Sequence, residues 1–196
     1  MAVTQDDPTV GTAERILDVA ERLVQTRGFN GFSYADVAAE LGITKAGLHY
    51  HYPGKAELGE ALIARYSVRF AEALGQIDDT VRGAHARLAA YAGLYAQVLS
   101  GDRMCLCGML AAEHQTLPQP MRSAVNGFFD ENEAWLTRVL AQGKSDSTLS
   151  YDGSSRDAAR TVLAALEGAM LVARAYGEPA RFQSAAARTL ASLAVS

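Results

Sequence analysis

The stretch FSYADVAAELGITKAGLHYHYPGKAELGEAL, residues 32–62, decides how this chain folds. Ser33 is a residue type that favours a helix N-cap, and apolar residues follow it at the spacing of one helical face. Gly42 fits the end of this short helix, because the residue after a helix often adopts a positive φ. Thr44 is a second N-cap residue, which opens another short helix over residues 45–51. Two short helices joined through a glycine predict a helix-turn-helix.

The helix-turn-helix predicts contact with double-stranded DNA. Its second helix fits the major groove, where each base pair shows a distinct set of hydrogen-bonding groups. Short helix pairs also occur in proteins that bind no DNA, so a helical adaptor that binds only protein is one alternative. A small helical enzyme is another, but the sequence shows no nucleophile–base pair, no glycine-rich phosphate loop and no metal-ligand spacing. We therefore expect no enzymatic activity, no cofactor and no metal.

Helical periodicity continues through the rest of the chain. Ala, Leu, Arg and Glu are frequent and Pro is scarce, which favours helices. We predict an all-α protein of about nine helices. Besides the two short helices, the expected helices cover residues 12–28, 55–75, 79–100, 105–116, 119–142, 155–176 and 179–194, with an exposed loop at 143–154. The long helix from Lys55 joins a DNA-binding domain, residues 1–54, to a ligand-sensing and dimerisation domain, residues 55–196.

The charge of the chain predicts a local DNA-binding surface and not a generally basic one. The formal net charge is −4, and residues 1–60 hold five Lys or Arg against nine Asp or Glu. The binding face must therefore segregate its charges, and DNA affinity should fall steeply with salt. The N-terminus does not have the pattern of a signal peptide, and no apolar stretch is long enough to span a membrane. We expect a cytoplasmic protein with reduced cysteines.

Residues 32–62, together with AERILDVAERLVQTRGF at residues 13–29, resemble the helix-turn-helix signature of TetR/AcrR-type repressors. The small residues, the glycine turn and the aromatic-Pro-x-Lys ending follow the family's order. The resemblance implies phosphate or backbone contacts from Ser33, Tyr34, Tyr50, His51 and Lys55, base-edge contacts from Thr44, Lys45, Ala46 and Gly47, and a base or phosphate contact from His49.

Two positions depart from the family pattern. His49 stands where Tyr is usual, and Gly47 stands where Thr or Ser is commoner, which leaves fewer direct base readers. Lys45 is the one long donor at the tip of the second helix, and Lys favours guanine O6 and N7. We expect at least one G·C pair in each operator half-site.

Apolar stripes on the last two helices predict a homodimer interface. Two such helices from each subunit would build a four-helix bundle, and the family resemblance implies the same arrangement. Operator half-sites also require a two-fold partner. The alternative is that the stripes pack only within one subunit. The expected contact residues are Val162, Leu166, Gly168, Met170, Ala173, Phe182, Ala186 and Leu190.

The segment RMCLCGMLAAEHQTL, residues 103–117, resembles the cysteine segment of TetR-type repressors that respond to N-ethylmaleimide and related electrophiles. Cys105 falls on the reactive cysteine, and a helix N-terminus and the neighbouring Arg103 are expected to lower its pKa. Cys107 is a candidate resolving thiol, although residues i and i+2 of a helix point apart. The alternative for both cysteines is packing, because free cysteines are often buried.

A reversible apolar pocket is the other sensor that the sequence predicts. Its expected lining is Tyr91, Tyr95, Met104, Met109, Phe128, Trp135 and Met170, with Glu113 or His114 as polar anchors. The resulting hypothesis is a homodimeric repressor that binds a palindromic operator. A small apolar ligand, or modification of a cysteine by an electrophile or oxidant, would release it. The choice between pocket and thiol stays open, as does activation in place of repression.

Overall fold

The computed structural model of this chain describes residues 11–195. Residues 1–10, where no signal peptide is expected and where the DNA-binding domain was expected to begin, lie outside the described residues. Within residues 11–195 the named elements are all helical, which confirms the all-α prediction. They are α1 (Thr12–Arg27), α2 (Tyr34–Leu41), α3 (Lys45–His51), α4 (Lys55–Thr80), α5 (Ala84–Ser100), α6 (Leu106–Ala112), the 3-10 helix η1 (His114–Thr116), α7 (Gln119–Ser145), α8 (Ser155–Tyr176) and α9 (Pro179–Ala191).

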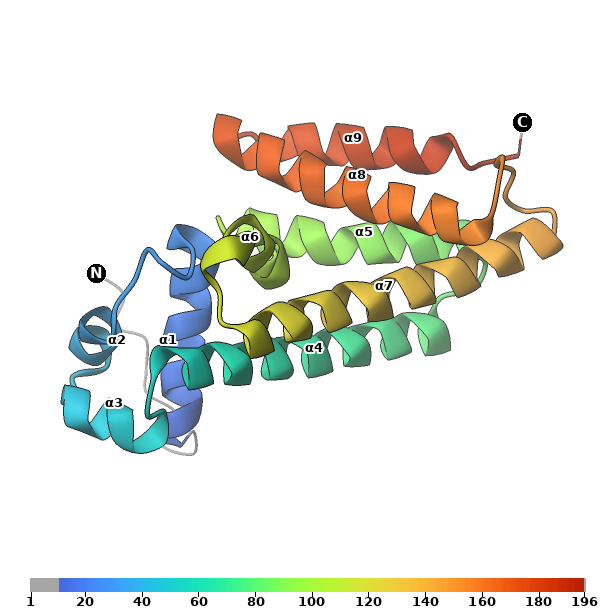
Figure 1. Cartoon of the computed structure of the whole chain (residues 1–196). Helices are drawn as coiled ribbons and strands as arrows, with labels where there is room; N and C mark the ends of the chain where they lie inside the picture. Colours follow the sequence, from blue (N-terminus) through green and yellow to red (C-terminus); the bar gives the residue numbers. More distant parts are fainter. Residues whose placement is uncertain (1–10, 196) are drawn as a thin grey trace.

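The helices form a small end and a larger body (Figure 1). α1, α2 and α3 make up the small end, and α4 leads from it along the length of the body. In the body α7 packs on α4 and α8, α8 packs along α9, and α5 contacts both α7 and α9. α1 touches α4 and α6 as well as α2, so it connects the small end to the body.

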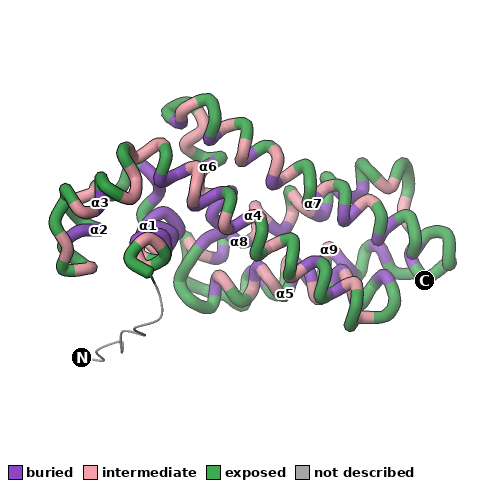
Figure 2. The backbone as a smooth tube through the Cα atoms, turned by 90° about the horizontal axis from the view of Figure 1, so that it is seen from below, coloured by how far each residue is buried: buried purple, intermediate pink, exposed green. Residues whose placement is uncertain are grey.

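The buried residues lie mainly on the parts of the body helices that face one another (Figure 2). They form one continuous hydrophobic core that extends into the small end through α1. α2 and α3 contribute few buried residues, among them Val37 and Leu48, each with 0% exposure. The small end therefore exposes most of its outer surface. None of the helices between residues 11 and 195 combines the length and apolarity that a membrane crossing requires.

Several helices differ in their bounds from the sequence prediction: α5 begins at Ala84 and not at residue 79, α9 ends at Ala191 and not at residue 194, and α4, α6 and α7 also differ. α4 continues to Thr80 because Leu74 and Ile77 extend its buried stripe by a further turn. The helix expected over residues 105–116 ends at Ala112 and is followed by η1. The break lies at Glu113, whose carboxylate is bound to the loop after α1.

The segment expected to be an exposed loop, residues 143–154, is partly structured. α7 runs to Ser145, and Leu149 inserts into the core with 2% exposure. The backbone of Leu149 also pairs with Ala194 in an isolated antiparallel bridge. Leu149 is an apolar side chain in a polar stretch of sequence, and this feature could have predicted its contact with the core.

Candidate DNA-binding site and regulatory core

Local hydrogen bonds shape the start of α2. The backbone N–H of Ser33 donates to a carboxylate oxygen of Asp36 at 2.7 Å, and the Ser33 hydroxyl donates to the same oxygen at 2.6 Å. These bonds favour the charged carboxylate and lower the pKa of Asp36. Ser33 is thus the N-cap that the sequence predicts, and Gly42 ends α2 with a φ of 65°.

The start of α3 is fixed in the same local way. The side-chain oxygen of Thr44 accepts the N–H of Gly47 at 3.0 Å, which confirms Thr44 as an N-cap. Leu48 is fully buried and anchors the helix on the small end. These contacts hold the N-terminal turn of α3 outward, in the orientation that a recognition helix needs.

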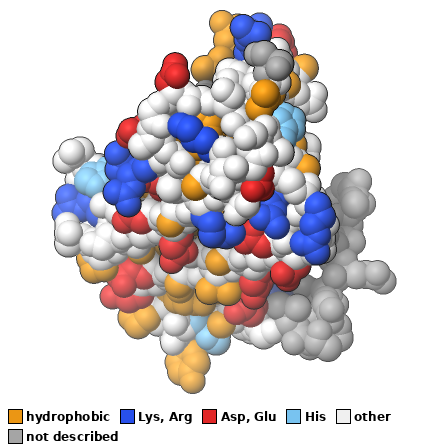
Figure 3. All heavy atoms as spheres, turned by 90° about the vertical axis from the view of Figure 1, so that its right-hand side faces the viewer, with side chains coloured by type: hydrophobic (Ala, Val, Ile, Leu, Met, Phe, Trp, Pro, Cys, Tyr) orange, Lys and Arg blue, Asp and Glu red, His pale blue; other side chains and the backbone are white. Residues whose placement is uncertain are grey.

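The tip of α3 is exposed and lightly charged. Lys45 and Ala46 are exposed, and Lys45 has no ion-pair partner within residues 11–195. Tyr50 is 85% exposed, and its ring meets the ring of His51 edge-on at 5.3 Å between centroids. The end of the molecule far from α1–α3 differs, because acidic and basic side chains are interspersed there (Figure 3).

Tyr34 ties the start of α2 to the end of α3. Its hydroxyl donates to the carbonyl of Tyr52 at 3.0 Å, and its ring lies 4.8 Å from the ring of His49. Burial, and then the negative charge of Glu57, raise the pKa of Tyr34 to about 12. The Nδ1 atom of His49 lies 3.0 Å from the carbonyl oxygen of Pro53. In the free protein both aromatic side chains therefore have internal partners.

Lys55 is held inside the small end. Its ammonium donates to the carbonyls of Phe29 and Phe32 and lies 4.6 Å and 4.3 Å from the centres of their rings. Burial lowers the pKa of Lys55. The residue thus stabilises the loop between α1 and α2, a role that the sequence did not reveal. The phosphate contact implied by the family resemblance stays a prediction.

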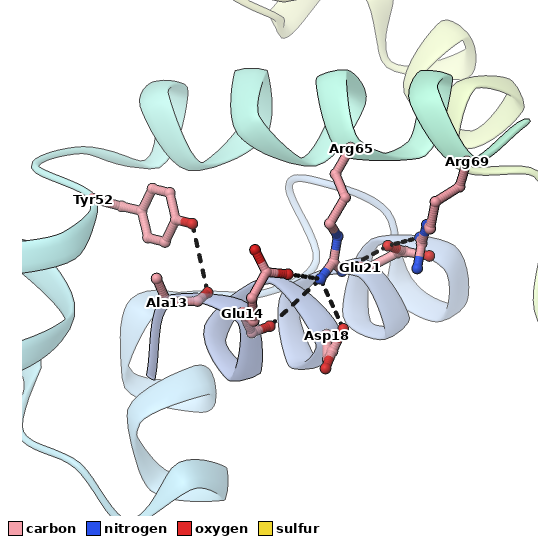
Figure 4. A network of polar contacts seen from close by, with 7 residues as sticks. All are labelled: Ala13, Glu14, Asp18, Glu21, Tyr52, Arg65 and Arg69. Carbon is pink, nitrogen blue, oxygen red and sulfur yellow. Dashed lines mark hydrogen bonds and ion pairs between the residues drawn. The ribbon is translucent and has the colours of Figure 1, made fainter. Parts of the chain in front are cut away.

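Ion pairs fasten α1 to α4 (Figure 4). Arg65 of α4 reaches Glu14 at 3.0 Å, and Asp18 and Glu21 at 2.8 Å each. Arg69, one turn further along α4, also pairs with Glu21. Glu21 is buried, so solvent screens its pairs less than it screens a surface pair. Two arginines therefore help to set the angle between α1 and α4.

Residues of the body also form hydrogen bonds with the C-terminal end of α1. Arg174 of α8 donates to the carbonyls of Gln25 at 2.7 Å and Thr26 at 2.6 Å. Glu113 accepts the backbone N–H of Phe29 at 2.6 Å. Glu113, one of the two expected polar anchors of a pocket, is therefore bound to the DNA-binding end in this structure. Its partner lies 84 residues away, and that of Arg174 lies 149 residues away, so no local pattern signals either contact.

Cys105 caps α6 from inside the core. Its Sγ accepts the N–H of Gly108 at 3.4 Å, and the hydroxyl of Tyr66 donates to the same sulfur at 3.7 Å. Burial raises the pKa of the Cys105 thiol well above its usual value, and the charge of Glu167 raises it further. The expected lowering of this pKa is therefore wrong. The helix N-terminus does lower it through Gly108, but burial is the larger effect, and Arg103 is exposed.

Glu167 of α8 is an acidic neighbour of both cysteines that the sequence analysis missed. Its Oε1 is buried without a hydrogen-bond partner within residues 11–195. Burial raises the pKa of Glu167 to about 7, although hydrogen bonding to Cys105 and Tyr95 lowers it. Burial and Glu167 also raise the pKa of Cys107. Glu167 is a charged residue within the apolar stripe of α8, and this feature of the sequence could have revealed its role.

Several residues expected to line a pocket pack together in an aromatic cluster. Tyr91, Tyr95 and Phe128 are almost fully buried. The Tyr91 hydroxyl donates to Asn132 Oδ1 at 2.9 Å and lies 3.1 Å from the Tyr95 hydroxyl. Trp135 stacks on Tyr91 with 5.5 Å between ring centres. Burial raises the pKa of Tyr91 and Tyr95. These polar groups are thus satisfied within the protein.

The remaining expected pocket residues are scattered. Met104 and Met170 are buried, and the Sδ of Met170 lies 3.3 Å from the backbone nitrogen of Cys105. Met109 and His114 are partly exposed. The cavities of the described chain do not bring all of these residues together. Across residues 11–195, no group of His, Cys, Asp and Glu side chains is placed to hold a metal ion.

The expected dimer residues lie mostly inside the subunit. α8 and α9 turn their apolar stripes toward each other and toward α5 and α7, because these are the most hydrophobic faces available. Gly168 is the exception, since it is exposed. The side chains buried within the subunit are Val162, Leu166, Met170, Ala173, Phe182, Ala186 and Leu190. Their expected role as contacts with a second subunit stays a prediction, while their packing agrees with the alternative that the stripes pack within one subunit.

The fold and the exposed α3 define the class of a helix-turn-helix regulator, and comparison with known proteins supports this class. Residues 16–62 match the family described as "Bacterial regulatory proteins, tetR family", and residues 84–189 match "Tetracyclin repressor-like, C-terminal domain". The chain belongs to the TetR family, which consists of transcriptional regulators.

Individual relatives agree with this assignment over most of the chain. The HTH-type transcriptional repressor NemR of Escherichia coli is 27% identical over 170 residues, which cover 83% of this chain and 84% of NemR. The structure of a TetR-family regulator from Agrobacterium tumefaciens matches with a TM-score of 0.90 at 31% identity, over 93% of this chain and 97% of that one. The reduced form of E. coli NemR matches with a TM-score of 0.82 at 25% identity, over 94% and 98%.

Proposed function

We propose that this chain is a cytoplasmic repressor that binds a palindromic operator as a homodimer and releases it when a small molecule or an electrophile reaches the body. The exposed, capped tip of α3 is the observation that carries the proposal. Lys45 and Ala46 stand outward on a helix that Thr44 and Leu48 hold in place. Similarity to the repressor NemR favours repression over activation.

Operator binding is tested with the DNA upstream of the chain's own gene. Fluorescence anisotropy would compare the wild type with Lys45→Ala, and with Arg82→Ala as the control. Arg82 is exposed, lies between α4 and α5, and has no ion-pair partner in the described chain. We expect Lys45→Ala to lose affinity for the specific site, by about tenfold if Lys45 reads a guanine. Equal affinity of the two variants would contradict the proposed role of α3.

For the dimer we propose the outward face of α8. Gly168, Leu171 and Val172 are exposed there, and Leu171 and Val172 retain 60% and 51% of their accessible surface. Large apolar side chains on one helix face commonly mark an interface. Sedimentation velocity on Leu171→Glu should show monomers, whereas Val68→Glu, an equally exposed apolar site on α4, should leave the dimer intact. A dimeric Leu171→Glu variant would exclude this face.

Thiol modification is a second route to release that we propose for this chain. A reduced form is described for NemR, and Cys105 stands at the N-cap of α6 beside Tyr66 and Glu167. Because burial keeps Cys105 in the thiol form, reaction requires the core around α6 to open first.

The thiol route has its own test. The wild type, Cys105→Ser and Cys107→Ser are treated with N-ethylmaleimide, and operator affinity is measured before and after. We expect the wild type and Cys107→Ser to lose affinity and Cys105→Ser to keep it. Equal loss in the wild type and Cys105→Ser would rule out Cys105 as the switch and leave reversible ligand binding as the route.

A further inference from the structure

A cleft of about 490 Å³ lies between α1, α4 and α5, next to the ion pairs that fasten α1. Small-molecule sites commonly have volumes of about 300–1,000 Å³ and combine apolar walls with a few polar groups. This cleft has both. Its apolar walls include Tyr66, Phe70, Leu94 and Val98, and its polar lining includes Glu21, Gln25, Arg69, Gln97 and Arg103.

The charged groups of the cleft favour an anion. The charged residues that line the cleft are Arg69, Arg103 and Glu21. Arg69 pairs with Glu21, whereas Arg103 has no ion-pair partner within residues 11–195. Arg65, which also pairs with Glu21, is outside the lining and is matched by Glu14 and Asp18. The cleft thus holds more positive than negative charge, and two guanidinium groups offer paired donors that suit a carboxylate.

A buried amide in the cleft has no partner. Gln25 is 2% exposed, and its Oε1 makes no hydrogen bond within the described chain. Its backbone carbonyl, by contrast, is held by Arg174 and by the N–H of Met104. Buried polar groups are normally paired, and an amide oxygen only accepts, so this unpaired oxygen points to an N–H or O–H donor on a ligand.

We propose that this cleft binds a small carboxylate with an apolar body, and that this molecule is the releasing ligand; the second part rests on the function proposed above. The carboxylate lies between Arg69 and Arg103, and Gln25 Oε1 accepts from a hydroxyl or N–H group elsewhere on the ligand. The apolar body lies along Phe70 and Leu94.

The position of this site also explains how ligand binding would change the affinity for operator DNA. A ligand carboxylate competes with Glu21 for Arg69, and this pair is one of the ties between α1 and α4 (Figure 4). α1 packs against α2, so a change in its angle moves α3. Because the coupling is reciprocal, operator DNA weakens carboxylate binding by the same factor by which the carboxylate weakens operator binding.

The test is calorimetric titration of the full chain with hexanoate, and with hexanamide as the neutral analogue. The variant Arg103→Gln removes one guanidinium, and Arg82→Gln is the control, since both residues are exposed and without ion pairs in the described chain. We expect the wild type and Arg82→Gln to bind hexanoate equally. Binding to Arg103→Gln should be at least about tenfold weaker, and hexanamide should bind as weakly, because a charge-assisted bond is lost in each case.

Equal hexanoate binding by the wild type and Arg103→Gln, or equal binding of hexanamide, overturns the site. Inorganic phosphate that binds as tightly as hexanoate overturns the need for an apolar body. Operator affinity is measured separately by anisotropy, with and without hexanoate. Operator binding that saturating hexanoate leaves unchanged overturns the release by this ligand. Absence of operator binding in a protein that still binds hexanoate overturns the proposed function and leaves the site standing.

Discussion

The helix-turn-helix and the core around Cys105 differ in how far apart in the sequence their interacting polar groups lie. In the helix-turn-helix the partners are near in sequence, since Ser33 bonds to Asp36, Thr44 to Gly47, and Tyr34 to a residue 18 positions away. Cys105 also has a local partner in Gly108, but its other partners come from 39 and 65 residues away. The recognition surface therefore rests on short-range contacts, whereas the core around Cys105 exists only once α4, α6 and α8 have packed.

The two regions also differ in which protonation state of their titratable groups they favour. The helix-turn-helix exposes Lys45 and stabilises the charged form of Asp36. The core instead buries an acid and two thiols, and their neutral forms are favoured there. Changes to the first region should act mainly on DNA affinity, and changes to the second on stability and its pH dependence.

The largest effect is expected where the helix-turn-helix itself depends on packing. Leu48→Ala removes the fully buried anchor of α3 and should destabilise the chain by about 2–5 kcal/mol. Urea unfolding followed by circular dichroism measures this loss. Ala46→Ser, at an exposed position on the same helix, is the control and should stay close to the wild type. A Leu48→Ala variant of wild-type stability would show that α3 does not need its core contact.

Glu167→Gln should change how stability depends on pH. The pKa of Glu167 is 4.5 in the unfolded chain and about 7 in the folded one. Below pH 4.5 both states are protonated, and as pH rises to 7 only the unfolded state loses its proton, so stability falls by about 3 kcal/mol. Gln does not titrate, so the variant should lose less stability between pH 5 and pH 8.

Urea unfolding at several pH values measures this difference, with Glu72→Gln as an exposed control on α4. Parallel pH profiles for the wild type and Glu167→Gln would mean that Glu167 is not the group that titrates in this range.

Lys55→Met tests the structural role of the ammonium. The Met side chain retains apolar contact with Phe29 and Phe32 but loses the bonds to their carbonyls, at a cost of about 2 kcal/mol. Lys45→Met, at the exposed tip, should cost no stability. The slope of operator affinity against salt tells whether Lys55 also meets a phosphate, because losing that contact flattens the slope by about one. Unchanged stability of Lys55→Met would contradict the structural role.

Thr44→Ala should have the smallest effect. Loss of the cap to Gly47 costs about 1 kcal/mol, and it loosens the turn that presents Lys45. Thermal unfolding and operator anisotropy measure the two consequences. Thr44→Ser keeps the hydroxyl and should restore both the thermal stability and the operator affinity. If Thr44→Ser behaved like Thr44→Ala, the methyl group and not the cap would be what matters.

The class of fold, the helix-turn-helix and its caps are predictable from the amino-acid sequence, because these features follow from local rules. Ser33, Gly42 and Thr44 act within their own turns, and the bounds of α8 are those predicted from its apolar spacing. The local rules also placed Cys105 at the start of α6.

The packing of the whole chain sets which helix faces are buried and which distant groups come into contact. It turned the apolar stripes of α8 and α9 inward, and it reversed the expected pKa shift of Cys105 by burying the thiol beside Glu167. It also joined Arg174 and Glu113 to the end of α1. Spacing along one helix predicts that a face is apolar, but what covers that face depends on the packing of helices distant in sequence.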